Sequence, residues 1–132
     1  MATGFTRETA TSILSSWINS NTLVCLSTTT PDMNGDNFTE PSAANGYARH
    51  TFGPTLLDVP GQVANAQVIF LFEATGDCGS ITHVGLARNY ESKPFLVAQL
   101  SSPLSVAKGY VPLIRAKQFV IGLDKDTLEA YP

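Results

Sequence analysis

The two histidines and the two cysteines of this 132-residue chain are the side chains best suited to catalysis or metal binding. Neither His50 nor His83 has a nucleophile or carboxylate at a recognisable catalytic spacing. Cys78 and His83 lie five residues apart across a predicted turn, but one cysteine and one histidine do not make a zinc site. No motif around this pair is typical of a cysteine nucleophile. We therefore expect no catalytic residues, no metal and no cofactor.

Structural roles fit these residues better than catalytic ones. His83 lies inside an apolar stretch and is expected to be a hydrogen-bonded core or interface histidine. Cys25 and Cys78 are too few for a disulfide framework, so we expect two small buried or half-buried side chains. Residues 32–36 place oxygen ligands at alternate positions, as the start of a calcium loop does. They lack that loop's glycine at the sixth place and acid at the twelfth, so we expect a polar turn.

Known catalytic signatures are also missing from the sequence. It has no glycine-rich phosphate loop opening a helix and no Gly-x-Ser-x-Gly motif. We therefore expect a protein that is not an enzyme. An enzyme with His83 or Asp77 in its active site is the least favoured alternative.

The chain is poor in charge. Charged residues make up 14% of it, well below the roughly 25% usual for soluble domains. A surface with so little charge is typical of a subunit in an oligomer or a larger assembly. The net charge of -3, without a cluster of lysine and arginine, argues against nucleic-acid binding.

Membrane insertion and export are not expected either. The longest apolar run, residues 68–72, is far shorter than the ~20 residues needed to span a bilayer. Residues 1–5 show no basic region followed by an apolar one, so we expect no secretory signal and folding in the cytosol.

One helix is expected near the N-terminus, over residues 6–20. Thr6 is suited to cap it, and Glu8 suits the positive end of the helix dipole. Its apolar side chains recur every three or four residues and share one face, namely Ala10, Ile13, Leu14, Trp17 and Ile18. This face has to lie on the protein's own sheet or on a neighbouring subunit.

The rest of the chain has the alternation and turn residues of short strands. We predict strands at 22–27, 47–52, 66–73, 80–88, 94–100, 110–114 and 118–123. The apolar run 66–73 suits a central strand that is covered on both faces, or on one face by an oligomeric partner. A long polar loop covers 28–45, an irregular segment 54–60, and a short crossing segment 101–109. The prediction is a single domain, 1–132, with a helix at about 6–20, a β domain at about 22–123 and a polar tail at 124–132. The fold class is mainly β, an antiparallel β-sandwich or short barrel with one N-terminal amphipathic helix.

Several short blocks occur in a characteristic order between residues 23 and 123. They read Leu-Ser-Thr-Thr-Thr-Pro at 26–31, Phe-Thr-Glu-Pro-Ser at 38–42, Gly-Tyr-Ala-Arg at 46–49, Ala-Thr-Gly-Asp at 74–77 and Gly-Ser-Ile-Thr-His-Val-Gly-Leu at 79–86. This order resembles a family of small structural proteins of tailed bacteriophages, commonly labelled phage tail fibre proteins. Cys78 stands where that family usually has tryptophan, and residues 87–89 and 108–110 also depart from its pattern.

The resemblance and the low charge together imply a virion component, made and assembled in the cytoplasm of a bacterial host. We expect an outer accessory protein, of capsid decoration (cement) or head-fibre type. Its partners would be copies of itself, as a trimer at a local threefold, and phage capsid or tail proteins. The alternative is a tail-fibre or tail-tip module that binds a host receptor or glycan through Tyr47, Tyr90 and Tyr110.

The helix and the loop 28–45 are the predicted interface. The candidate contact residues are Ile13, Trp17, Phe38, Glu40, Pro41, Tyr47, Arg49 and His83. Tyr47 and Arg49 combine an aromatic ring with a fork of donors, a common interface pairing. The opposite interpretation is equally open: Tyr47 packs in the core and Arg49 pairs locally.

Overall fold

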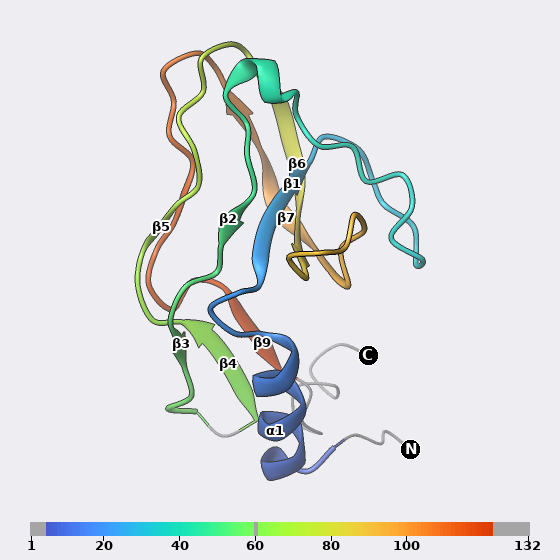
Figure 1. The fold of residues 1–132 in the computed structure, drawn as a ribbon, viewed down its shortest axis with the longest axis vertical. Coiled ribbons are helices and arrows are strands. Elements are labelled where there is room, and N and C mark those ends of the chain that lie inside the picture. The colour runs from blue at the N-terminus through green and yellow to red at the C-terminus, as the bar shows by residue number, and fades with distance from the viewer. Residues whose placement is uncertain (1–4, 60, 123–132) are drawn as a thin grey trace. The chain divides into compact units, whose positions relative to one another are not determined.

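The computed structural model describes residues 5–59 and 61–122, which group into two compact units (Figure 1). The first unit contains residues up to 20, 52–69 and those from 114 onward; the second contains 21–51 and 70–113. Because the chain enters each unit more than once, the units are not successive stretches of sequence. The predicted polar tail, 124–132, lies outside the described residues.

The first unit contains the expected helix, α1 (Arg7–Trp17). Thr6 caps it, accepting a hydrogen bond from the Thr9 N–H through its hydroxyl, and Glu8 lies in the first turn. The helix buries Ala10 and Leu14, and it packs on strands of its own unit. It ends before the predicted Ser20, because the backbone is already extended at Ile18.

The sheet of the first unit has the order β3 (Thr55–Leu56), β4 (Gln62–Asn65) and β9 (Val120–Gly122), with antiparallel pairing. Its central strand β4 was not predicted, and β3 falls inside the segment expected to be irregular. Two-residue strands such as β3 depend on their partner, so local sequence gives little sign of them.

Asn65 is the buried polar centre of this unit, with no exposed surface. Its Nδ2 donates to the carbonyls of Gln67 (2.9 Å) and Arg115 (2.8 Å), and its Oδ1 accepts from the Phe119 N–H (3.0 Å). One side chain therefore holds three backbone groups, two of them about fifty residues away in sequence. It does so as a substitute for strand pairing.

The second unit is built on a four-stranded antiparallel sheet of order β2 (His50–Thr51), β1 (Leu23–Ser27), β6 (Gly79–Ala87) and β7 (Leu96–Val106). Val24 pairs with Leu86 and Leu26 with Val84, and all four are buried. The opposite face of the sheet, called here the outer face, carries Gly85 and His83 from β6.

Several predicted strands differ in extent from the structure. The predicted strand 47–52 is reduced to β2, and 110–114 is reduced to its last two residues. The predicted strand 94–100 and crossing segment 101–109 form a single strand, β7, which accommodates Pro103 because it is an edge strand with a register shift opposite Ile81 and His83. The predicted central strand 66–73 is reduced to β5 (Ile69–Phe70), which pairs with β8 (Leu113–Ile114).

The predicted class, mainly β with one N-terminal helix and antiparallel pairing, is confirmed. The described strands form three open sheets, which suits the sandwich alternative better than a closed barrel. A single turn of 3₁₀ helix, Ala43–Asn45, ends the long loop and is followed by Gly46 in the left-handed conformation.

Candidate functional site

The predicted loop 28–45, called here the covering loop, is attached to the outer face of the second unit's sheet. Its Phe38 ring lies over Gly85, where a Cβ in place of the glycine hydrogen would be 3.1 Å from the ring and 3.0 Å from the Pro94 Cβ. A side chain at this position would press on both neighbours, which would have to move by a few tenths of an ångström.

We expect Gly85→Ala to destabilise the protein by about 1–3 kcal/mol, as overpacking does in a filled contact. Urea unfolding followed by circular dichroism measures this change. In a Phe38→Ala background the same substitution is expected to be milder, because the ring it strikes is gone. An equal effect in both backgrounds would show that Phe38 does not hold the loop at Gly85.

Two residues after Phe38 the covering loop is held by a cluster of Glu40, Tyr47 and Arg49. Arg49 donates to both oxygens of the Glu40 carboxylate, from Nε at 2.8 Å and from Nη2 at 3.0 Å. The Tyr47 hydroxyl donates to Glu40 Oε1 and accepts from the Leu26 N–H at 3.1 Å. The tyrosine thus closes an edge of β1 that β2 leaves unpaired, in the way a neighbouring strand would.

Arg49 also reaches the turn before β7, where Nη1 donates to the Glu91 carbonyl (2.9 Å) and Nη2 to that of Ser92 (2.5 Å). The guanidinium therefore joins the covering loop to a turn more than forty residues further along. Its planar fork suits this multiple contact, whereas a lysine offers a single point charge.

The predicted interface residues have different surroundings. Tyr47 is only 8% exposed and packs edge-on against Phe72, and the Arg49 and Glu40 side chains are 19% and 27% exposed. The core-and-local-pair alternative for Tyr47 and Arg49 is therefore the one the structure has. Among the other candidates, Trp17 is exposed, Ile13, Phe38 and Pro41 are half-buried, and His83 is buried.

Burial alone would raise the pKa of Glu40, but the hydrogen bonds from Arg49 and Tyr47 outweigh it and hold that pKa below its ordinary 4.5. A carboxyl with a depressed pKa in the folded state stabilises the fold above its ordinary pKa. That stability is lost as the pH falls through the lower, folded pKa.

We therefore expect the free energy of unfolding to fall as the pH drops below about 4.5, with Glu40 contributing to the loss. Urea titrations from pH 7 to pH 3 measure this. Glu40→Gln is expected to flatten the acid limb, whereas the exposed Glu73→Gln is expected to leave it unchanged. Parallel acid limbs in wild type and Glu40→Gln would contradict the assignment.

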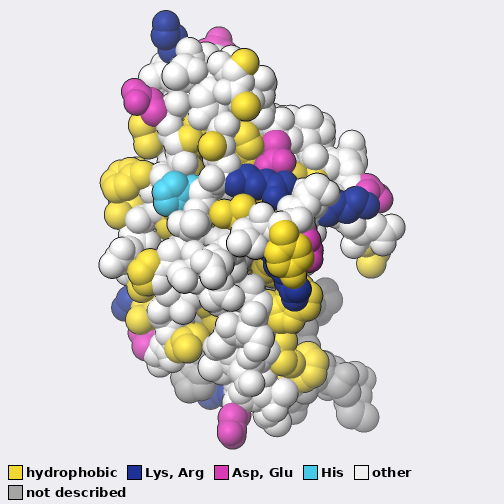
Figure 2. All heavy atoms as spheres, in the orientation of Figure 1, with side chains coloured by type: hydrophobic (Ala, Val, Ile, Leu, Met, Phe, Trp, Pro, Cys, Tyr) yellow, Lys and Arg dark blue, Asp and Glu magenta, His cyan; other side chains and the backbone are white. Residues whose placement is uncertain are grey.

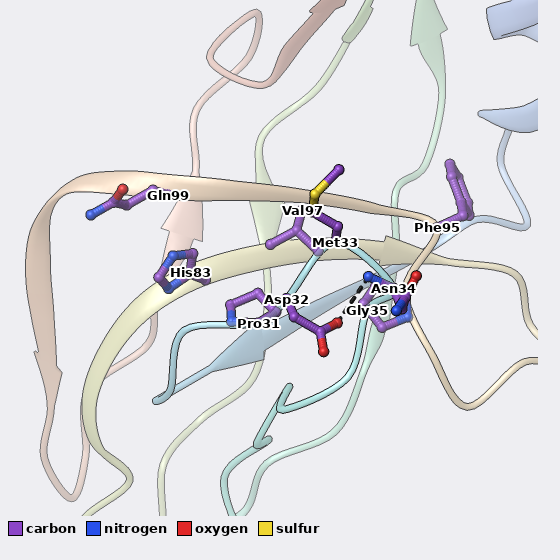
Figure 3. A pocket seen from close by; sticks show the side chains of 10 residues that line it. Pro31, Asp32, Met33, Asn34, Gly35, His83, Phe95, Val97 and Gln99 are labelled. Atoms are coloured by element: carbon purple, nitrogen blue, oxygen red, sulfur yellow. Dashed lines mark hydrogen bonds between the residues drawn. The ribbon is translucent and has the colours of Figure 1, made fainter.

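An open pocket of about 620 Å³ lies between the tip of the covering loop and the outer face of β6 and β7 (Figure 3). It is lined by Pro31, Asp32, Met33, Asn34, Gly35, His83, Pro94, Phe95, Val97 and Gln99. His83 alone among these residues was a predicted contact residue. The pairing of His83 with Gln99 creates the pocket floor, and no local pattern encodes that register.

The expected polar turn at 32–36 is present. Asp32 Oδ1 accepts from the N–H groups of Asn34 (2.8 Å, Figure 3) and Asp36 (2.9 Å). Within residues 5–59 and 61–122 no three histidine, cysteine or acidic side chains lie together as metal ligands would. Cys25 and Cys78 are free and buried, as predicted, and burial raises the pKa of Cys25 to about 12.

Comparison with protein-family models, with curated proteins and with solved structures finds no match. In the described part of the chain, no helix has the length and apolar character needed to cross a membrane.

Proposed function

We propose that this protein is a structural, non-enzymatic component of a tailed-phage virion, an outer accessory protein of capsid decoration or head-fibre type. It binds copies of itself and capsid or tail proteins through symmetric contacts. The order of the sequence blocks, which resembles that of small phage structural proteins, supports the phage assignment, and the low charge supports a place within a larger assembly.

The observation that carries the binding role is an apolar surface on the ribbon formed by 70–74 and 110–113, called here the apolar ribbon. The segments run antiparallel, with the Leu71 N–H donating to the Pro112 carbonyl (2.9 Å). Leu71 and Pro112 are buried, whereas Phe70 is 57% and Leu113 43% exposed. Tyr110 and Val111 are exposed beside them.

Figure 2 shows hydrophobic side chains on the surface over the region of β5, with few charges among them. Soluble monomers rarely expose large contiguous apolar patches, and such patches often mark protein–protein contacts. Leu113 and Phe70 belong to the ribbon's exposed face, so a partner can cover them without rearrangement of the fold.

Copy number in purified virions tests the proposal. Quantitative mass spectrometry is expected to find the protein in hundreds of copies per particle for decoration, whereas a dozen or fewer would indicate a tail position. A Leu113→Lys variant is expected to fold but to be lost from particles, and Val59→Lys, at an exposed position in the first unit, is the matched control. Absence of the wild-type protein from intact virions would refute the proposal.

A further inference from the structure

The pocket under the covering loop has a polar floor with unused hydrogen-bonding capacity. His83 is 7% exposed, and its Nδ1 lies 2.8 Å from the Thr82 hydroxyl. Its other ring nitrogen, Nε2, has no hydrogen-bond partner among the described residues. Because no fully buried side-chain nitrogen or oxygen there lacks a partner, Nε2 must open onto the pocket.

Gln99 lies directly across from His83 on β7, and the two side chains share one side of the pocket (Figure 3). The described residues offer no partner to the Gln99 amide, which is exposed. Asp32 keeps one carboxylate oxygen for a ligand, because its backbone hydrogen bonds use only Oδ1. The pocket thus offers the Asp32 carboxylate as an acceptor, together with the Gln99 amide, which both donates and accepts.

The remaining lining is apolar, with Phe95 and Val97 beside the polar floor and Met33 at the rim. Neither lysine nor arginine lines the pocket, and Asp32 would repel an anion. One carboxylate, half engaged in its own turn, is too little for a cation. A neutral ligand with several hydroxyl groups and one apolar face matches this lining.

We propose that this pocket binds a neutral saccharide. Sugar hydroxyls donate to Asp32 and exchange hydrogen bonds with Gln99 and His83, while the C–H face of the ring packs against Phe95 and Val97. The volume of about 620 Å³ lies within the roughly 300–1,000 Å³ of small-ligand sites and has room for more than one sugar unit. The site differs from the three tyrosines first considered for glycan binding, one of which, Tyr47, is buried.

Saturation-transfer NMR on the full chain tests the proposal with glucose, galactose, mannose, N-acetylglucosamine and maltose, each at about 10 mM, where a contact of millimolar affinity is visible. We expect transfer to at least one of them. Gln99→Leu is expected to weaken its binding roughly tenfold, the loss of about one hydrogen bond. His83→Phe is expected to weaken it by a similar factor while keeping a ring of similar shape.

Gln67→Leu makes the same chemical change at an exposed position of the first unit and is expected to bind as wild type does. The proposal is overturned if no sugar of the panel shows transfer. It is equally overturned if both pocket variants bind as wild type, or if the peptide Gly-Ser-Gly gives as strong a response as the sugars. These results are independent of virion copy number, so the pocket and the virion role fail separately.

Discussion

Asn65→Asp is expected to destabilise the protein by about 4 kcal/mol, because two backbone carbonyls lose their donors and face an anionic oxygen in their place. The Gln67 and Arg115 carbonyls are both held by Nδ2 in the native protein, and aspartate has no hydrogen to offer them when ionised. The Phe119 N–H keeps its acceptor, so the loss comes from the amide nitrogen alone. Urea unfolding at pH 7 measures the change.

Asn89→Asp is the matched control, since Asn89 is exposed in the turn after β6. Its replacement is expected to leave the unfolding midpoint within the error of the measurement. A small domain has a net stability of roughly 5–15 kcal/mol, so the Asn65 variant is expected to unfold far more readily. If both variants were equally stable, Asn65 would not be the polar centre of the first unit.

Arg49→Met is expected to destabilise the protein by about 3 kcal/mol, since removing one partner of a partly buried ion pair leaves the other charge uncompensated. The substitution leaves the Glu40 carboxylate without its cationic partner, and the carbonyls of Glu91 and Ser92 lose their donors. The methionine side chain retains most of the apolar stem, so the change isolates the guanidinium.

Arg115→Met serves as the control, because Arg115 is exposed and its neighbours use only its backbone groups. It is expected to unfold like wild type. The Arg49 variant is also expected to expose the covering loop, so limited proteolysis followed by mass spectrometry would find new cleavage within residues 28–45. If the variant were as stable as wild type and its covering loop stayed uncut, Arg49 would not be what holds that loop in place.

The ion pair of Lys93 with Asp36 provides a useful contrast in the same unit. Both side chains are more than half exposed, and their contact is a surface one. Exposed pairs are screened by water and salt and contribute little to stability. We therefore assign the attachment of the covering loop to Phe38 and Arg49 rather than to Lys93.

Local sequence signals predicted those elements whose own residues decide them. The helix followed from a capping threonine and apolar spacing of three and four, and β1 and β6 followed from β-branched and apolar runs. The prediction of a central strand over 66–73 was wrong in extent and position, because the segment forms only the two-residue β5, in a two-stranded sheet with β8. In the structure Ile69 and Leu71 are buried while Phe70 is exposed, so one face of the segment packs in the core and the other faces solvent.

The candidate site could be predicted only in part. The residue types of Glu40, Tyr47 and Arg49 marked them as candidates. Whether they form an exposed interface or hold the covering loop depends on their hydrogen bonds to backbone groups of Leu26, Glu91 and Ser92. The pocket residue Gln99 carried no signal at all, because a single glutamine in an apolar strand is ordinary.

By itself the sequence determined the class of the fold, its early helix and a surface short of charge, since backbone propensity and the spacing of apolar side chains act over a few residues. Tertiary structure alone decided that Gln99 lies beside His83, that Phe38 rests on Gly85 and that Asn65 holds distant backbone groups. Such contacts join residues far apart in the chain, and the register that brings them together is selected by the packing of the whole fold.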